Sequence, residues 1–333
     1  MGSYGRYLSQ RFIIFIVSIF ISITVVFFVP RLVPGDPMSG VLAKLGEMGG
    51  VRGAQELVDA YREIFGFDKS LGIQYLSYLR ELARGNLGVS IAMFPVPVSE
   101  VLMRALPWTI GLLTVTTIIS WILGTFIGAV VGWRGEESKL SKALVPAALI
   151  LYSIPYYILA IILVFLFAFL WQIFPLSGGH SLQIEFSVEF IGDLLWHATL
   201  PALSIVLVSL GWWFLSMRSM IIPLRGEDYI TLAKAKGLKP RRILWKYGFR
   251  NALLPQVTGL AIAFGHIVGG AIITEVIFAY PGLGWRLYES ITGLDFPVIQ
   301  GAVLLIILAV ATANFIVDAI YPLIDPRIRY GRK

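Results

Sequence analysis

The sequence predicts an all-α integral membrane protein with six transmembrane helices and both termini in the cytosol. Hydrophobic residues make up 57% of its 333 residues and charged residues only 14%, a composition that excludes an ordinary soluble domain. The apolar residues gather into runs that reach the roughly 20 residues a helix needs to cross a bilayer. The predicted spans are residues 11–30, 106–133, 143–171, 198–222, 253–279 and 299–321.

The distribution of charge sets the orientation of these spans. With the N-terminus inside, the cytosolic segments hold 18 of the 27 lysines and arginines, and these residues gather on the cytosolic side of membrane proteins. Only five acidic residues fall on the same side. The net charge of +7 is therefore a product of topology and does not indicate nucleic-acid binding.

Residues 1–30 are predicted as an N-terminal tail and the first transmembrane helix. We expect this helix to stay in the protein, because its apolar core is longer than that of a signal peptide and no small-residue cleavage site follows it. Residues 31–105 are predicted to lie outside, which is too long for a simple connection. Leu57, Ala60 and Ile64 recur there at helical spacing. We therefore expect a small helical extracytoplasmic insertion, with a flexible loop as the alternative.

Residues 106–321 are predicted as the transmembrane core, and residues 322–333 as a cytosolic tail. The second span carries Gly124, Gly128 and Gly132 on one helical face, and small residues at this spacing let helices approach closely in lipid. We expect helix packing there, with pathway lining as the alternative. In the third span, Ser153-Ile-Pro155 predicts a kink, because proline removes a backbone hydrogen bond.

A cytosolic loop at 223–252 separates the fourth and fifth spans, and its first half predicts a short helix. Glu227 and Asp228 stand at the start of this helix, and Lys234 and Lys236 near its end, as the helix dipole favours. Gly237 supplies the left-handed stop, so we expect a positive φ at that residue.

The second half of the loop predicts another helix. Pro240 is suited to its first turn, and Arg242, Lys246 and Arg250 recur at i, i+4 and i+8 as one basic stripe. Asn251 then marks where the chain returns to an apolar run. The cap, glycine, proline and basic residues together form a compact element on which another protein can push.

Several polar or helix-breaking residues in the spans are candidates for a pathway or an outer gate. Glu275 ends the fifth span, and a carboxylate near lipid is costly enough to suggest a function. Its alternative role is structural, holding the outer loop by hydrogen bonds; Asn314 and Asp318 in the sixth span have similar alternatives. The full set of gate or pathway candidates is Ser153, Pro155, His266, Glu275 and Asn314.

Two stretches resemble the permease subunits of dipeptide/oligopeptide-type ABC importers. The first is Ala233-Lys-Ala-Lys-Gly237 with Arg250-Asn-Ala-Leu-Leu-Pro255. The second is Glu275, Pro281-Gly-Leu-Gly284, Asp295-Phe-Pro297 and Gln300-Gly301. The likeness extends over nearly the whole chain. One departure is Thr231, which stands where the motif of the wider family begins with glutamate.

The resemblance implies a multi-pass protein of the cell membrane (an inner or plasma membrane) that forms half of a translocation pathway for dipeptides or oligopeptides. It implies as partners a second homologous permease subunit, two ATP-binding subunits and an extracytoplasmic substrate-binding protein. The cytosolic loop would couple the chain to the ATPases, and ATP and Mg²⁺ would be used by those partner subunits. The matching coupling residues are Tyr229, Ala233, Lys234, Ala235, Gly237, Arg242, Lys246, Arg250 and Asn251.

We expect no catalytic, cofactor or metal site in this chain. No Gly-Lys pair exists to form a phosphate cradle. The chain has no cysteine, and His180, His197 and His266 lack a second ligand at metal spacing. Two alternatives stay open. One is the same importer architecture for β-linked oligosaccharides, whose rings could stack on tryptophans at the span ends. The other is an ATPase-independent secondary transporter, which would be expected to show broken helices or charges at mid-membrane.

The predicted orientation can be tested by cysteine labelling, which is clean because the chain has no native cysteine. We expect a membrane-impermeant reagent, applied to intact cells, to label single cysteines at positions 52 and 181 and to spare those at 242 and 333. Labelling at 242 before permeabilisation would contradict the topology.

Overall fold

The protein is described by a computed structural model that covers residues 3–32, 54–183, 185, 187–267 and 271–324. Helices form the regular structure throughout these residues, and the one β-type contact is an isolated bridge between Val89 and Pro97. The all-α prediction is confirmed for this part of the chain. The chain divides into two compact units, one of residues 1–109 and 281–333 and one of residues 110–267 and 271–280.

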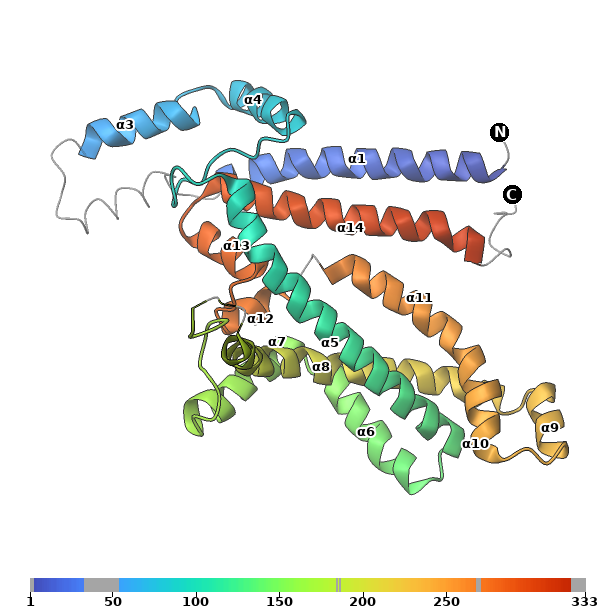
Figure 1. Ribbon diagram of the computed structural model, residues 1–333. Helices are drawn as coiled ribbons and strands as arrows, with labels where there is room; N and C mark the ends of the chain where they lie inside the picture. The colour runs from blue at the N-terminus through green and yellow to red at the C-terminus, as the bar shows by residue number, and fades with distance from the viewer. Residues whose placement is uncertain (1–2, 33–53, 184, 186, 268–270, 325–333) are drawn as a thin grey trace. The chain divides into compact units, whose positions relative to one another are not determined.

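The first unit is built on two long helices, α1 (Ser3–Leu32) and α14 (Phe296–Ile324), which run alongside each other (Figure 1). Their contact includes aromatic packing, with the Phe15 and Phe315 ring centroids 5.3 Å apart. The remaining helices are α3 (Ala54–Phe65), α4 (Leu71–Ala83), the start of α5 (Val98–Arg134) and α13 (Leu283–Thr292). Helices α3 and α4 fall in the segment for which the sequence predicts a helical insertion.

A buried carboxylate ties the loop after α4 to the loop before α14. Asp295 is 1% exposed, and it accepts hydrogen bonds from the Ser90 hydroxyl and from the backbone N–H groups of Ile91 and Ala92. Its Oδ1 lies 3.4 Å from the N–H of Val298 in the first turn of α14. A buried charge is tolerated only when it is hydrogen-bonded in this way. The segment Asp295-Phe-Pro297 therefore has a structural role, because its carboxylate holds the two loops together.

The second unit contains the rest of α5 and a series of shorter and longer helices. They are α6 (Lys139–Ser153), α7 (Tyr156–Leu163), the π-helix η1 (Val164–Leu170), α8 (Val188–Leu224), α9 (Asp228–Ala235), α10 (Pro240–Ile243), the π-helix η2 (Leu244–Phe249), α11 (Arg250–His266) and α12 (Ile272–Ile277). Helices α6 and α7 both pack against α8.

Four described helices are long and apolar enough to cross a membrane: 5–32, 98–134, 188–224 and 296–316. A fifth candidate is the pair α6 and α7–η1, which is bent by 96°. The bend lies at Ile154, which is extended (ψ 124°) because the ring of the following Pro155 disfavours helical backbone there. The predicted kink of the third span is therefore a sharp break. The predicted fifth span includes residues 268–270, which lie outside the described part, and the count of six spans stays a prediction.

Close packing of α5 on α8 accounts for the glycine stripe of the second span. A Cβ added at Gly124 would lie 2.6 Å from the Cβ of Trp213, and one at Gly128 would lie 2.4 Å from the carbonyl oxygen of Phe214. Only glycine lets the two backbones approach this closely. The packing interpretation of these glycines is confirmed.

This contact predicts a contrast between two alanine substitutions in α5. Gly128→Ala should destabilise the protein by about 1–3 kcal/mol, because the clash is with backbone that cannot rotate away. Gly111→Ala has no atom within 4 Å of its added Cβ and should instead stabilise α5 by about 0.5–1 kcal/mol. Thermal unfolding of both variants in detergent, followed by tryptophan fluorescence, is the measurement. Equal stabilities would contradict the packing interpretation.

Candidate functional site

The loop between α8 and α11 presents a short helix, α9, which stands out at one end of its unit (Figure 1). Glu227 is the N-cap and Asp228 the first residue of α9. At the other end, Gly237 has φ +70°, as predicted. Its N–H donates to the Lys234 carbonyl (2.9 Å) and the N–H of Leu238 donates to the Ala233 carbonyl (3.3 Å). This pair of bonds is a Schellman motif, the usual use of a left-handed glycine at a helix end.

The second half of the loop differs from the prediction in its helix type. Pro240 does open a helix, but α10 continues without a break into η2 and α11. The π-helical turn coincides with Gly248, where an added Cβ would lie 3.0 Å from Cζ3 of Trp133. A π-turn carries an extra residue, so the predicted i, i+4, i+8 stripe does not follow from α-helical spacing here. The three basic residues of that stripe are nevertheless all exposed.

One face of α9 is anchored on the rest of the protein. Ile230, Ala233 and Ile243 are buried together, and Trp133 at the end of α5 packs against them with Tyr229, Leu238 and Tyr247. This small core holds α9 against α10 and α5. Ala233, predicted as a coupling residue by resemblance, is therefore part of the anchor and not of the free surface.

The opposite face of α9 is open. Lys234 and Ala235 are exposed, as is Leu232, with 55% of its surface accessible. The sequence alone does not single out Leu232, because one apolar residue in a short helix gives no periodic signal. The loop exposes seven lysines and arginines, and none of them forms an ion pair within the described residues: Lys234, Lys236, Lys239, Arg241, Arg242, Lys246 and Arg250. The surface offers unpaired positive charge around an apolar side chain.

A polar contact joins the two halves of the loop. The side-chain amide of Asn251, at the start of α11, donates to the Tyr229 hydroxyl of α9 (3.1 Å) and to the Tyr247 carbonyl (2.9 Å). Asn251 and Tyr229, which the resemblance names as coupling residues without pairing them, are therefore in direct contact. The contact fixes the orientation of α9 relative to the helix that leads back into the membrane.

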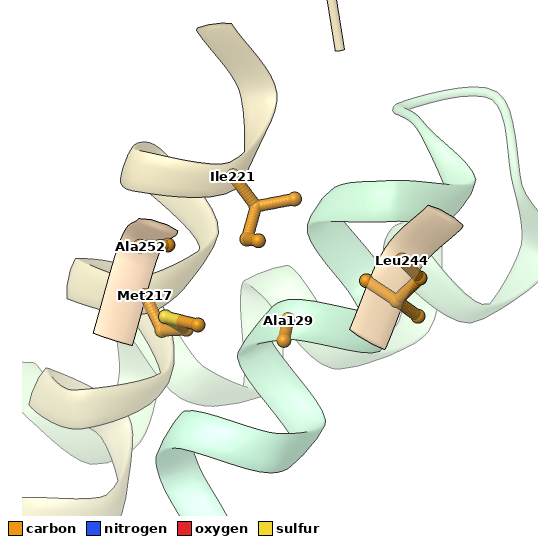
Figure 2. Packing of buried hydrophobic residues seen from close by; sticks show 5 residues of the cluster. All are labelled: Ala129, Met217, Ile221, Leu244 and Ala252. Carbon is orange, nitrogen blue, oxygen red and sulfur yellow. The ribbon is translucent and has the colours of Figure 1, made fainter. Parts of the chain in front are cut away.

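An apolar cluster is formed where the long helices α5 and α8 pack against η2 and α11. Figure 2 shows Ala129 of α5, Met217 and Ile221 of α8, Leu244 of η2 and Ala252 of α11 gathered around one point. Four of these side chains are at most 3% exposed, and Leu244 is 7% exposed. Interiors of this kind are close-packed and transmit displacement. A displacement of η2 would therefore also displace the side chains of α5, α8 and α11 that pack against it.

The gate candidates of the second unit lie on different helices. Ser153 donates its hydroxyl to the Leu149 carbonyl of its own helix (2.7 Å), and Pro155 is the N-cap of α7. Glu275 lies on α12, which packs against α7 and α8, and is fully buried. His266 ends α11, but its side chain lies outside the described part of the structure.

Asn314 belongs to the other unit and lines a cavity between α1 and α14. The cavity has a volume of about 470 Å³. Its polar lining includes Ser18, Arg11 and Asp318, and the last two form an ion pair of 3.2 Å. The structure thereby gives Asp318 a partner on α1. Asn314 itself is exposed.

Known proteins are similar to this chain in sequence and in fold. The family model described as binding-protein-dependent transport system inner membrane component matches residues 122–330. A probable peptide ABC transporter permease of Sinorhizobium fredii is 32% identical over 99% of this chain and 100% of its own length. The oligopeptide transport system permease AppB of Bacillus subtilis is 31% identical over 94% and 96%. The dipeptide transport system permease DppB of Escherichia coli is 32% identical over 95% and 97%.

Among solved structures, the methionine ABC transporter MetNI in an inward-facing conformation aligns with a TM-score of 0.53. The alignment covers 68% of this chain and 97% of that chain at 18% identity. At this identity the likeness concerns the fold.

The contact between Asn251 and Tyr229 predicts a measurable coupling. We expect Asn251→Ala and Tyr229→Phe each to speed amide hydrogen exchange in α9, with a coupling of about 0.5–1.5 kcal/mol between them in a double-mutant cycle. Tyr247→Phe is the matched control, because Asn251 bonds the backbone carbonyl of that residue and not its hydroxyl. Strictly additive effects of the first two changes would show that the contact does not hold α9.

Proposed function

The chain belongs to the family of binding-protein-dependent transport system inner membrane components, and from this membership we propose that it is one permease subunit of an ATP-driven importer of dipeptides or oligopeptides. The observation that carries the proposal is the capped helix α9, anchored on one face and open on the other. Such an element can receive a push from a separate protein and pass it into the membrane helices.

The contacts of α9 support a specific path by which a displacement of this helix would reach the membrane helices. An ATP-binding subunit would contact the open face of α9, where Leu232 supplies an apolar point and the surrounding lysines and arginines attract acidic side chains. The bond between Asn251 and Tyr229 would carry the displacement to η2 and α11. The cluster of Figure 2 would then pass it to α5 and α8.

The chain itself would do no chemistry in this scheme. ATP hydrolysis, with Mg²⁺, would take place in two separate ATP-binding subunits. A second homologous permease would supply the other half of the pathway, and an extracytoplasmic binding protein would deliver the substrate. The loop 223–252 would lie in the cytosol, as the charge distribution predicts.

Peptides are the substrate class we favour. The relatives that match nearly their full length are named for peptides, dipeptides or oligopeptides, and β-linked oligosaccharides are not favoured by these likenesses. The break at Ser153 and Pro155, the cavity at Asn314, and the residues Glu275 and His266 are the places where we would look for the pathway and its gates. Glu275, being buried, would act there through the outer loop.

Reconstitution tests the proposal. Proteoliposomes that contain this chain, the companion permease and two ATP-binding subunits should take up peptide only with ATP and the loaded binding protein. This chain alone should show neither uptake nor ATP hydrolysis. Robust uptake by the chain alone, driven by a proton or sodium gradient, would replace the proposal with a secondary transporter.

A pair of substitutions at one position, supported by a charge reversal, tests the role of the loop in the same assay. Gly237→Val should lower ATP-dependent uptake about tenfold or more, because a β-branched residue at positive φ costs ~1–3 kcal/mol. Gly237→Asn is the control, since asparagine tolerates the left-handed conformation and no atom lies within 4 Å of an added Cβ. Arg242→Glu should also lower uptake. Normal uptake by the valine and glutamate variants would remove the assigned role.

A further inference from the structure

A cavity that the proposed transport mechanism does not use lies at the C-terminal end of α1, with several polar side chains in its lining. Its volume is about 290 Å³, and its lining comes from α1, the end of α3, α4, the loops beside α4 and the first turns of α14. All of these residues belong to one unit. The volume is at the lower end of the range for small-molecule sites, so it suits a headgroup or a chain terminus.

Two buried polar groups in this lining have no hydrogen-bond partner in the part of the chain that the structure describes. Gln300 is only 7% exposed, and its Nε2 makes no hydrogen bond; neither does the buried hydroxyl of Tyr78. Folded proteins leave few such groups unsatisfied, and each one calls for an explanation. Burial raises the pKa of Tyr78 to about 12, against the opposing effect of Arg31. The phenol therefore remains a hydrogen-bond donor at neutral pH.

Arg31 brings a positive charge to the same cavity. Its Nε donates to Oε1 of Gln74 (3.2 Å), its Nη1 donates to the Phe27 carbonyl (2.8 Å), and its guanidinium stacks 3.7 Å from the Phe27 ring centroid. These contacts hold the guanidinium in place, and within the described residues Nη2 donates no hydrogen bond. Glu81 also lines the cavity, but its two oxygens accept from Arg84 and Asn86. Among the described residues, Arg31 has no carboxylate partner.

A guanidinium, an amide N–H₂ and a phenol O–H form a donor set that suits an oxyanion, and arginine in particular matches phosphate. The position of the cavity indicates which oxyanion. It lies at the end of a helix that is long and apolar enough to span a membrane, where lipid headgroups are found. The adjacent surface of α1 exposes Phe28 (38%), Val29 (51%) and Leu32 (79%), an apolar surface suited to an acyl chain.

We propose that this cavity is a phospholipid site, in which Arg31, Tyr78 and Gln300 bind the headgroup phosphate. With the predicted topology, the lipid belongs to the extracytoplasmic leaflet. The site does not depend on the proposed transport function, because nothing in its chemistry involves the cytosolic loop. The lipid would join α1, α4 and α14 by satisfying donors that each of them contributes.

The test is a binding titration on the full chain, purified and delipidated in detergent, with thermal unfolding and native mass spectrometry as readouts. Short-chain phosphatidylglycerol should raise the unfolding temperature and appear as one bound lipid. Diacylglycerol with the same chains, which lacks the phosphate, should do neither. Two further probes test the other possible oxyanions: inorganic phosphate represents a free phosphate ion, and an unmodified tripeptide represents a peptide carboxylate.

Conservative variants locate the site. Tyr78→Phe and Gln300→Leu should each weaken phosphatidylglycerol binding about tenfold, and Arg31→Gln should weaken it further. Without lipid, Gln300→Leu should be at least as stable as wild type, because it removes an unsatisfied buried amide. Arg104→Gln is the matched control, since this arginine is exposed, pairs with Glu100 and lies outside the cavity.

Each other outcome overturns the proposal. An equal effect of diacylglycerol would mean that the phosphate is not recognised. Unchanged binding in Arg31→Gln and Gln300→Leu would place the lipid elsewhere. A shift with the tripeptide but not with lipid would make the cavity a carboxylate site, and a shift with inorganic phosphate alone would make it a site for the free ion.

Discussion

The close approach of α5 to α8 is the contact on which the second unit depends. Lipid tails provide no hydrophobic drive for helices to associate, so packing and hydrogen bonds must do so. Gly124 and Gly128 allow the two backbones to meet without an intervening side chain. The ends of the same two helices nearest the loop carry Trp133, Met217 and Ile221, which form the surface against which η2, α11 and the loop pack. Loosening the crossing would separate those parts and remove the support of α9.

The sequence predicts local features of the loop well, because short-range physics decides them. The bounds of α9, its acidic start and the positive φ at Gly237 follow from capping and dipole effects within about one turn. The π-turn of η2 is different, since it accompanies the contact of Gly248 with Trp133, a residue more than a hundred positions away. The bond between Asn251 and Tyr229 likewise needs the tertiary path of the chain. A sequence motif can therefore include both residues without showing that they are in contact.

The spans show the same division between local and tertiary causes. Proline at 155 predicts a kink in the third span, but the 96° angle between its two parts depends on the packing of α6 and α7 against α8. Polar residues are harder to assign, because composition does not reveal burial. Glu275 is fully buried, whereas Asn314 is exposed beside the ion pair of Arg11 and Asp318. The same rule, that polar groups near lipid are costly, flags both residues and cannot distinguish them.

A buried polar contact joins α5, α8 and α11. Gln256 of α11 is 1% exposed and donates to the Ser216 hydroxyl of α8 (2.9 Å), while its backbone carbonyl accepts from the Trp121 indole of α5 (3.2 Å). Breaking either bond in an apolar surrounding would leave unsatisfied groups, at a cost of about 1–3 kcal/mol for each. Sliding α11 along its neighbours breaks both bonds, whereas rotating the three helices together breaks neither. Under the proposed coupling through α9, a displacement of that helix would therefore favour a rigid-body rotation over a slip of one helix.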